Sequence, residues 1–226
     1  QSLIDEFGAE LAVIRGRLDG LENDMDGFEA GVFSTTTKLS GSTTYVIGGT
    51  SVGDNEALTF NYDTKIALES SFNGDDLFVN RIRVGNFEDG DPFSGSGAMA
   101  LETASSTSVE GNDILTIDRS FYQFPIGDDW TATVGARVRQ DDMLGVWPSD
   151  YPSDAVLDVL TYAGANDTYN LAVGQGAGIT WSNDNLVASA LFVSADGADA
   201  SDSESDPGGL LTDHGRDTIT TQLAWV

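Results

Sequence analysis

The chain has 226 residues, with 10 lysines and arginines against 37 aspartates and glutamates, and a formal net charge of −27 at pH 7. This excludes nucleic acid as a partner, because binding a phosphate backbone requires clustered basic residues. The chain has no cysteine, which excludes disulfides and thiolate chemistry. No apolar run reaches the roughly 18 residues expected of a membrane helix, although membrane-crossing strands are shorter and only half apolar.

Residues 1–31 are predicted to form a helix with an unbroken heptad seam. An apolar seam of period 3.5 with charged flanks favours a coiled coil, although a single amphipathic helix packed on its own domain is the alternative. Gly8, Gly16, Gly20 and Gly27 weaken the helix. A coiled coil requires partner helices, so we expect an oligomer, with a homotrimer as the first choice. The seam residues are Ile4, Phe7, Leu11, Ile14, Leu18, Leu21, Met25 and Phe28.

Residues 32–226 are predicted to be all β, because apolar and polar residues alternate with the period of two that gives a strand one apolar and one wet face. Leu58, Phe60 and Tyr62, for example, alternate with Thr59, Asn61 and Asp63. Eight strands are expected, near 33–47, 57–72, 77–87, 113–126, 130–139, 169–182, 186–195 and 217–226.

The connections between these strands alternate between long and short. The long ones are roughly 48–56, 88–112, 140–168 and 196–216, and the short ones are 73–76, 127–129 and 183–185. Tight turns at one end and long loops at the other are typical of an antiparallel meander in an outer-membrane β-barrel. The predicted helix precedes the first strand, so the stalk is expected on the short-turn, periplasmic side. The last expected strand runs to the final residue, so we expect a fragment of a longer protein.

A soluble sandwich and a membrane barrel both give one apolar face per strand. Three observations favour the barrel. The strands are longer than the about 5–6 residues usual in globular proteins. Aromatic residues lie near the strand ends. Acidic residues are concentrated in the long connections, and basic residues are concentrated on the strands. The four long connections contain 19 acidic residues and one basic residue, Arg216, whereas seven of the ten basic residues lie on strands.

Charged side chains on barrel strands are expected to face a water-filled lumen, since a charge facing lipid costs about 2–4 kcal/mol at mid-depth. Solvated arginines on the outside of a soluble sheet are the alternative. The pattern leaves the direction of Arg119 open, because Leu115, Ile117 and Phe121 share its face. The expected lining residues are Lys38, Lys65, Arg81, Arg83, Arg119, Arg137 and Arg139, with Asp63 and Glu69 opposing them.

The third long connection contains a predicted short helix within 153–164, because apolar residues follow a Ser-Asp start. We hypothesise that this segment folds into the lumen as a constriction, with Asp154, Asp158 and Tyr162 as candidates; a helix on the outer rim or a further short strand are the alternatives. No nucleophile stands near the only histidine, His214, and the acidic loop around Asp202 matches no calcium-loop spacing. No catalytic residue, metal site or cofactor is therefore predicted.

The heptad helix followed by Val-Phe-Ser-Thr-Thr-Thr-Lys-Leu-Ser-Gly (32–41) resembles the major outer-membrane porins of cyanobacteria, in the carbohydrate-selective OprB-like porin family. Val-Gly-Asn-Phe (84–87) and Ile-Asp-Arg-Ser-Phe-Tyr-Gln-Phe-Pro-Ile-Gly (117–127) add to the resemblance. It implies a cell-wall-binding domain, a coiled-coil stalk and a trimeric barrel of about sixteen strands, of which this chain would hold the stalk and about eight strands.

The expected function is passive diffusion of small hydrophilic solutes, ions and carbohydrates through an outer-membrane porin. The expected partners are two further copies of the chain, outer-membrane lipid, the solutes, and the cell wall through an N-terminal domain outside this chain. A structural tether between outer membrane and wall, with incidental transport, and a soluble secreted sandwich or adhesin are the alternatives.

Overall fold

The computed structural model describes residues 15–18, 36–49, 57–87, 93–94, 99–104, 113–161, 168–169 and 172–226. The chain divides into two units, residues 1–38 and 39–226. In the first unit, residues 15–18 are helical and the seam residue Leu18 is exposed. The other seven predicted seam residues lie outside the described part of the chain. Within the described ranges, no helix combines the length and the hydropathy needed to cross a membrane.

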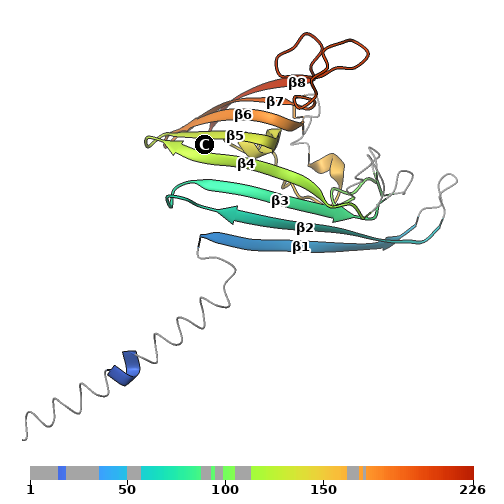
Figure 1. Cartoon of the computed structure of the whole chain (residues 1–226), viewed down its shortest axis with the longest axis horizontal. Coiled ribbons are helices and arrows are strands. Elements are labelled where there is room, and N and C mark those ends of the chain that lie inside the picture. Colours follow the sequence, from blue (N-terminus) through green and yellow to red (C-terminus); the bar gives the residue numbers. More distant parts are fainter. Residues whose placement is uncertain are drawn as a thin grey trace, which may run out of the picture. The chain divides into compact units, whose positions relative to one another are not determined.

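The described strands form one eight-stranded antiparallel sheet in which each strand pairs with the next along the chain (Figure 1). This confirms the predicted meander of eight strands. The sheet is open, with β1 and β8 at its two edges. The strands are β1 Thr37–Gly48, β2 Thr59–Ser70, β3 Leu77–Gly85, β4 Thr116–Ile126, β5 Trp130–Arg139, β6 Val173–Ser182, β7 Leu186–Ser194 and β8 Asp217–Trp225.

The short connections lie together at one end of the sheet, at the left of Figure 1, and the long connections lie at the other end. Gly74 and Gly127 have φ angles of 98° and 68° in two of the short turns, a backbone conformation that glycine adopts without a steric penalty. The β2–β3 turn is also held by Asp76, whose Oδ1 accepts hydrogen bonds from Ser71 Oγ and from the amides of Phe72 and Asn73. The alternation of short and long connections that the sequence predicted is therefore present in the structure.

One face of the sheet is covered by the chain's own long connections, and we call it the inner face. Glu102 reaches Lys65 on β2, and Gln140 reaches Thr220 on β8. The 3₁₀ turn η1 (Gln140–Met143) lies over the middle strands, where an added Cβ at Gly178 would lie 3.0 Å from Met143 Sδ. The absence of a side chain at Gly178 thus allows η1 to approach the sheet closely.

The apolar core lies between η1 and the inner face. Its buried members come from four strands, β3, β4, β5 and β7, and from η1, so the β5–β6 connection is part of the core. They are Val79, Phe121, Val138, Met143, Leu191 and Val193, with Leu77, Leu144 and Ala172 packed against them.

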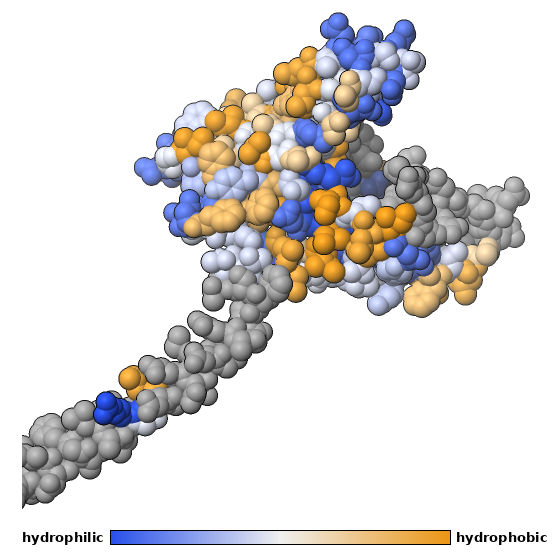
Figure 2. Space-filling view, in the orientation of Figure 1, coloured by the Kyte–Doolittle hydropathy of each residue, from blue (hydrophilic) through white to orange (hydrophobic). Residues whose placement is uncertain are grey.

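The opposite, outer face exposes most of its apolar side chains. Phe60 and Leu223, near opposite edges of the sheet, are 63% and 76% exposed. Other exposed apolar residues on this face are Leu39, Tyr45, Ile47, Leu58, Ile66, Ile117, Ile126, Trp130, Val134, Ile179, Ile219 and Trp225. Figure 2 shows hydrophobic side chains spread over the strands, with hydrophilic ones gathered on the β7–β8 loop at the top.

Aromatic side chains on the outer face cluster toward the short turns. Phe72 packs against Phe78 and Tyr122, Tyr122 stacks on Phe124, and Trp130 lies beside Trp181 with ring centroids 6.5 Å apart. The residues at this end therefore form an aromatic row along several neighbouring strands, as the sequence predicted for strand ends.

Two irregularities in pairing change which face a residue occupies. Arg81 pairs with Arg119 but Ile82 pairs with Ile117, so β4 contains one extra residue, Asp118. Ser120 pairs with Arg137 but Phe121 pairs with Gly135, so β5 likewise contains an extra residue. Because an extra residue reverses the alternation beyond it, these two bulges decide the positions of Arg119 and Arg137.

Candidate functional site

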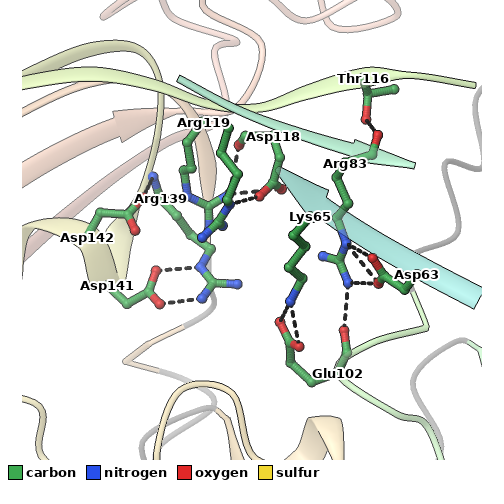
Figure 3. A network of polar contacts seen from close by, with 11 residues as sticks. Asp63, Lys65, Arg83, Glu102, Thr116, Asp118, Arg119, Arg139, Asp141 and Asp142 are labelled. Atoms are coloured by element: carbon green, nitrogen blue, oxygen red, sulfur yellow. Dashed lines mark hydrogen bonds and ion pairs between the residues drawn. The ribbon is translucent and has the colours of Figure 1, made fainter. Parts of the chain in front are cut away.

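Ten charged side chains form a network on the inner face, drawn in Figure 3. Five are basic and five are acidic, so their formal charges balance. The basic members come from strands, whereas three of the acidic members come from the covering connections. The network consists of Lys65, Arg81, Arg83, Arg119 and Arg139 with Asp63, Glu102, Asp118, Asp141 and Asp142.

The first half of the network joins β2 and β3 to residues 99–104. Lys65 and Arg83 are directly opposite each other in the antiparallel pairing. Lys65 Nζ lies 2.9 Å from Glu102 Oε2, and Arg83 forms a bidentate ion pair with Asp63 while Nη2 donates to the Glu102 carbonyl at 2.9 Å. Since opposite residues on antiparallel strands share a face, the two cations together hold one point of the β3–β4 connection.

The second half joins β3, β4 and β5 to η1. Arg119 Nε donates to Asp142 Oδ2 at 2.5 Å, and Nη1 donates to the Asp118 carbonyl at 2.8 Å. Arg81 pairs with Asp118, and Arg139 pairs with Asp141 through two hydrogen bonds. Arg119 is only 2% exposed, so its charge is compensated inside the protein and not by bulk water.

Asp142 occupies a special place in this half, because it accepts hydrogen bonds from both Arg119 Nε and the Arg139 amide. Burial raises the pKa of Asp142 despite the opposing attraction of Arg119, and the neighbouring negative charge of Asp141 raises it further. The Arg119–Asp142 contact therefore joins a carboxylate whose ionised form burial disfavours to a cation that is itself 2% exposed.

The two covering connections also contact each other. Leu101 and Leu157 form an isolated antiparallel bridge, and the Asp158 amide donates to the Ala100 carbonyl at 2.9 Å. The 3₁₀ turn η2 (Asp158–Leu160) follows directly. Residues 99–104 and 156–161 thus form one unit, which Glu102 attaches to β2 through its ion pair with Lys65 and to β3 through the hydrogen bond from Arg83 to its backbone carbonyl.

Residues 140–147 cover the other half of the inner face by neutral hydrogen bonds. Gln140 Nε2 donates to Thr220 Oγ1 at 2.6 Å. The Val146 amide donates to Gln222 Oε1 at 3.0 Å, and Gln222 Nε2 donates back to the Val146 carbonyl at 2.7 Å. The inner-face side chains of β8 thereby satisfy the backbone of an otherwise irregular segment.

Six of the nine predicted lining residues belong to the network: Asp63, Lys65, Arg81, Arg83, Arg119 and Arg139. Glu69 lies on the inner face opposite Val79, outside the network, and Lys38 is exposed on β1. Arg137 lies on the outer face, opposite Ser120, and is exposed. Of the constriction candidates, Asp154 is exposed, Asp158 begins η2, and Tyr162 lies outside the described residues.

Sequence reasoning missed the four acidic partners Glu102, Asp118, Asp141 and Asp142. Three of them had a signal, because Asp118 adjoins Arg119 and the pair Asp141-Asp142 closely follows Arg139. Glu102 is 37 residues from Lys65, and only the fold brings the two together.

No family model matches the chain. It is similar to two cyanobacterial proteins. Uncharacterized protein alr4550 of Nostoc sp. is 32% identical over 193 residues, which cover 80% of this chain and 33% of that protein. Uncharacterized protein sll0772 of Synechocystis sp. is 29% identical over 235 residues, covering 100% of this chain and 41% of that protein. The chain thus spans about a third to two fifths of the length of these relatives.

The side chains of the network are lysines, arginines and carboxylates that are paired with one another. Within the described residues, no three metal-ligating side chains are grouped so that they could hold a metal ion. The most accessible basic members are Arg81 and Lys65, whose side chains are 28% and 22% exposed. Positive and negative groups therefore alternate along the inner face, an arrangement that can interact with dipolar and ionic solutes through reversible contacts.

Proposed function

We propose that this chain is the N-terminal part of an outer-membrane porin through which small hydrophilic solutes, ions and carbohydrates diffuse passively. The proposal is supported mainly by the different residues on the two faces of the sheet. The outer face exposes its apolar residues, whereas the inner face carries a balanced network of ten charged residues. The inner face also holds the small apolar core under η1, but a soluble domain would not leave the apolar side chains of its other face uncovered.

A hydrocarbon environment accounts for both faces. A lipid-exposed strand needs its backbone bonded to neighbouring strands and its apolar side chains outward, with polar side chains toward the lumen. The strands contain 9–12 residues, close to the about 9–11 that a tilted strand needs to cross a bilayer. The aromatic row near the short turns supports an interfacial girdle at the periplasmic side.

The rest of the protein would close the sheet. Both edge strands of a membrane barrel must be paired, because an open edge in lipid leaves backbone groups unsatisfied. The two cyanobacterial relatives are two to three times as long as the matched region, which leaves room for further strands. The resemblance to the OprB-like porins of cyanobacteria supports about sixteen strands, a periplasmic coiled-coil stalk formed by residues 1–31 and a trimer.

Transport through this lumen would be only weakly charge-selective. Acidic partners neutralise the basic residues that the sequence predicted to line the lumen. A passing solute would therefore meet paired positive and negative groups and not a ring of basic residues. Residues 99–104, 140–147 and 156–161 would narrow the pathway, since they lie over the inner face.

The test is single-channel recording of the full-length protein in planar bilayers with a salt gradient. Lys65→Gln would leave Glu102 uncompensated and shift the reversal potential toward cation selectivity. Glu102→Gln would shift it toward anion selectivity. Asp128→Asn, an exposed substitution in the β4–β5 turn, is the matched control and is expected to leave selectivity unchanged.

Opposite shifts from the two variants, with none from the control, would support a conducting lumen lined by this network. Folded, membrane-inserted protein that does not conduct would instead favour the tether between outer membrane and wall. Protein that remains in solution without detergent would favour the soluble sandwich.

A further inference from the structure

Basic residues stand directly opposite each other at two places on the inner face. Lys65 on β2 is opposite Arg83 on β3, and Arg81 on β3 is opposite Arg119 on β4. We call these four residues the basic block. Like charges at directly opposite positions of antiparallel strands destabilise a sheet. The block therefore requires anionic groups close by, and the protein's own carboxylates use the donors of its members to different extents.

Arg81 has the most donors left over. Its Nε donates to Asp118 Oδ2, whereas Nη1 and Nη2 bond to no residue in the described part of the chain. Neither nitrogen is buried, and the side chain is 28% exposed. Arg83, by contrast, donates through Nε and Nη2 to Asp63 and to the Glu102 carbonyl. Arg81 thus presents the planar fork of its two terminal nitrogens to the space above the inner face.

Arg119, opposite Arg81, also has a donor left over. Both guanidinium groups bond the carboxylate of Asp118, because Arg81 donates to Oδ2 and Arg119 Nη1 donates to Oδ1 at 3.2 Å. Arg119 Nε is taken by Asp142 (Figure 3). Its Nη2 is buried and has no partner among the described residues, although buried donors are normally bonded. The two arginines therefore share Asp118 and keep terminal nitrogens of both side chains uncommitted.

The free fork of Arg81 favours one class of ligand. A carboxylate or phosphate group offers two oxygens that match the parallel N–H groups of a guanidinium, and such bidentate pairs are among the strongest hydrogen bonds in proteins. A halide offers a single centre, and a neutral hydroxyl lacks the charge. Lysine would not replace arginine here, because an ammonium is a point charge without a planar fork.

We propose that the fork of Arg81, beside Arg119, binds the carboxylate or phosphate group of a small solute on the inner face. The inference rests on the proposed function and names one class among the hydrophilic solutes. Chloride would pass the network without being held, because paired charges give only weak selectivity for simple ions. Solutes that carry an oxyanion would be retained at Arg81, so their effect on the current would saturate.

Recording from the full-length protein in planar bilayers tests the site, in sodium chloride with sodium acetate or inorganic phosphate added at constant ionic strength. Each oxyanion should reduce the chloride current saturably. Arg81→Lys keeps the charge but removes the fork, so the half-blocking concentration should rise about tenfold, the effect of losing one charged hydrogen bond. Arg216→Lys, at a side chain that is 71% exposed, makes the same exchange outside the network and should change nothing.

Block by both anions would support a general oxyanion site, and block by only one would assign the site to carboxylates or to phosphates. A chloride current that neither anion blocks saturably, or equal block in wild type and Arg81→Lys, would overturn the site and leave the channel intact.

Thermal unfolding in detergent micelles with the same salts measures binding without conduction. Acetate or phosphate should raise the unfolding temperature of the wild type and of Arg216→Lys, but not that of Arg81→Lys. Membrane-inserted protein that does not conduct, yet is stabilised in this pattern, would overturn the channel and retain the site. The absence of stabilisation in the wild type would contradict the site whether or not the protein conducts.

Discussion

Arg119 on β4 donates its Nε to Oδ2 of Asp142 in η1 at 2.5 Å, and this contact joins the sheet to the connection that covers it. Arg119 is buried, and its second carboxylate partner, Asp118, is the bulge residue that precedes it. One charged pair therefore links the irregular pairing of β4, the path of the β5–β6 connection and the inner-face network.

Replacing Arg119 with leucine should strongly destabilise the fold. The substitution leaves Asp142 and Asp118 without a shared cation in a poorly hydrated site, and removing one partner of a buried ion pair costs about 3–5 kcal/mol. Urea unfolding of the refolded protein in detergent micelles measures the loss. The control is Arg216→Ala, whose side chain is 71% exposed and whose pair with Asp196 should contribute about 0–1 kcal/mol. Equal effects of the two substitutions would contradict the structural role of Arg119.

The β2–β3 turn should make stability depend on acid through Asp76. Burial opposes ionisation of this carboxyl, but hydrogen bonds from Tyr122 and Ser71 outweigh it and hold the pKa of Asp76 far below its usual range. Because the pKa is lower in the folded state, the ionised carboxylate stabilises the protein above the unfolded-state pKa of about 3.9, and this contribution is lost as pH falls below that value.

Asp76→Asn should therefore unfold at a lower temperature than the wild type at pH 7, and the difference should shrink as the pH falls below about 4. Thermal unfolding followed by circular dichroism across this range provides the measurement. Asp75→Asn is the matched control, because Asp75 is an exposed neighbour in the same turn. A difference between wild type and Asp76→Asn that does not change with pH would show that the charge of Asp76 is not what holds the turn.

A side chain at Gly145 should displace residues 140–147 from the inner face. A Cβ there would overlap Val187 Cγ1 and lie 2.9 Å from Thr180 Cγ2, and both neighbours are fixed on strands. If this segment narrows a pore, Gly145→Leu should increase single-channel conductance in the full-length protein. Asp150→Leu introduces a leucine at an exposed position of the same connection and should leave conductance nearly unchanged. Unchanged conductance in both would remove this segment from the solute pathway.

A charged residue introduced on the outer face should destabilise the protein if this face lies in lipid, and should have little effect if the face lies in water. Ala190 is exposed between Ile179 and Thr221 on the outer face. Ala190→Arg should make folding into phospholipid vesicles less favourable by about 2–4 kcal/mol if this position lies near mid-depth. Asp128→Arg, in the short β4–β5 turn, should have little effect. Refolding titrations in urea with vesicles present compare the two, and a harmless Ala190→Arg would argue against a membrane location for this face.

The sequence determined the strands, their order and most of their two-sided character. Period-two alternation from Leu58 to Glu69 predicted that Asp63 and Lys65 share one face of β2, and both belong to the network on the inner face. The rhythm of short and long connections predicted the meander, because turns as short as 127–129 allow only antiparallel neighbours. These features depend on local geometry, which a single stretch of sequence encodes.

Only the tertiary structure decided the positions of Arg119 and Arg137 and the partners of the basic residues. One extra residue in β4 and one in β5 reverse the alternation beyond them, and a bulge of this kind carries no reliable sequence signal. The pairing of Lys65 with Glu102 and of Gln140 with Thr220 depends on loops that return to the sheet. Such contacts are set by where the whole chain places two distant segments, which local periodicity does not contain.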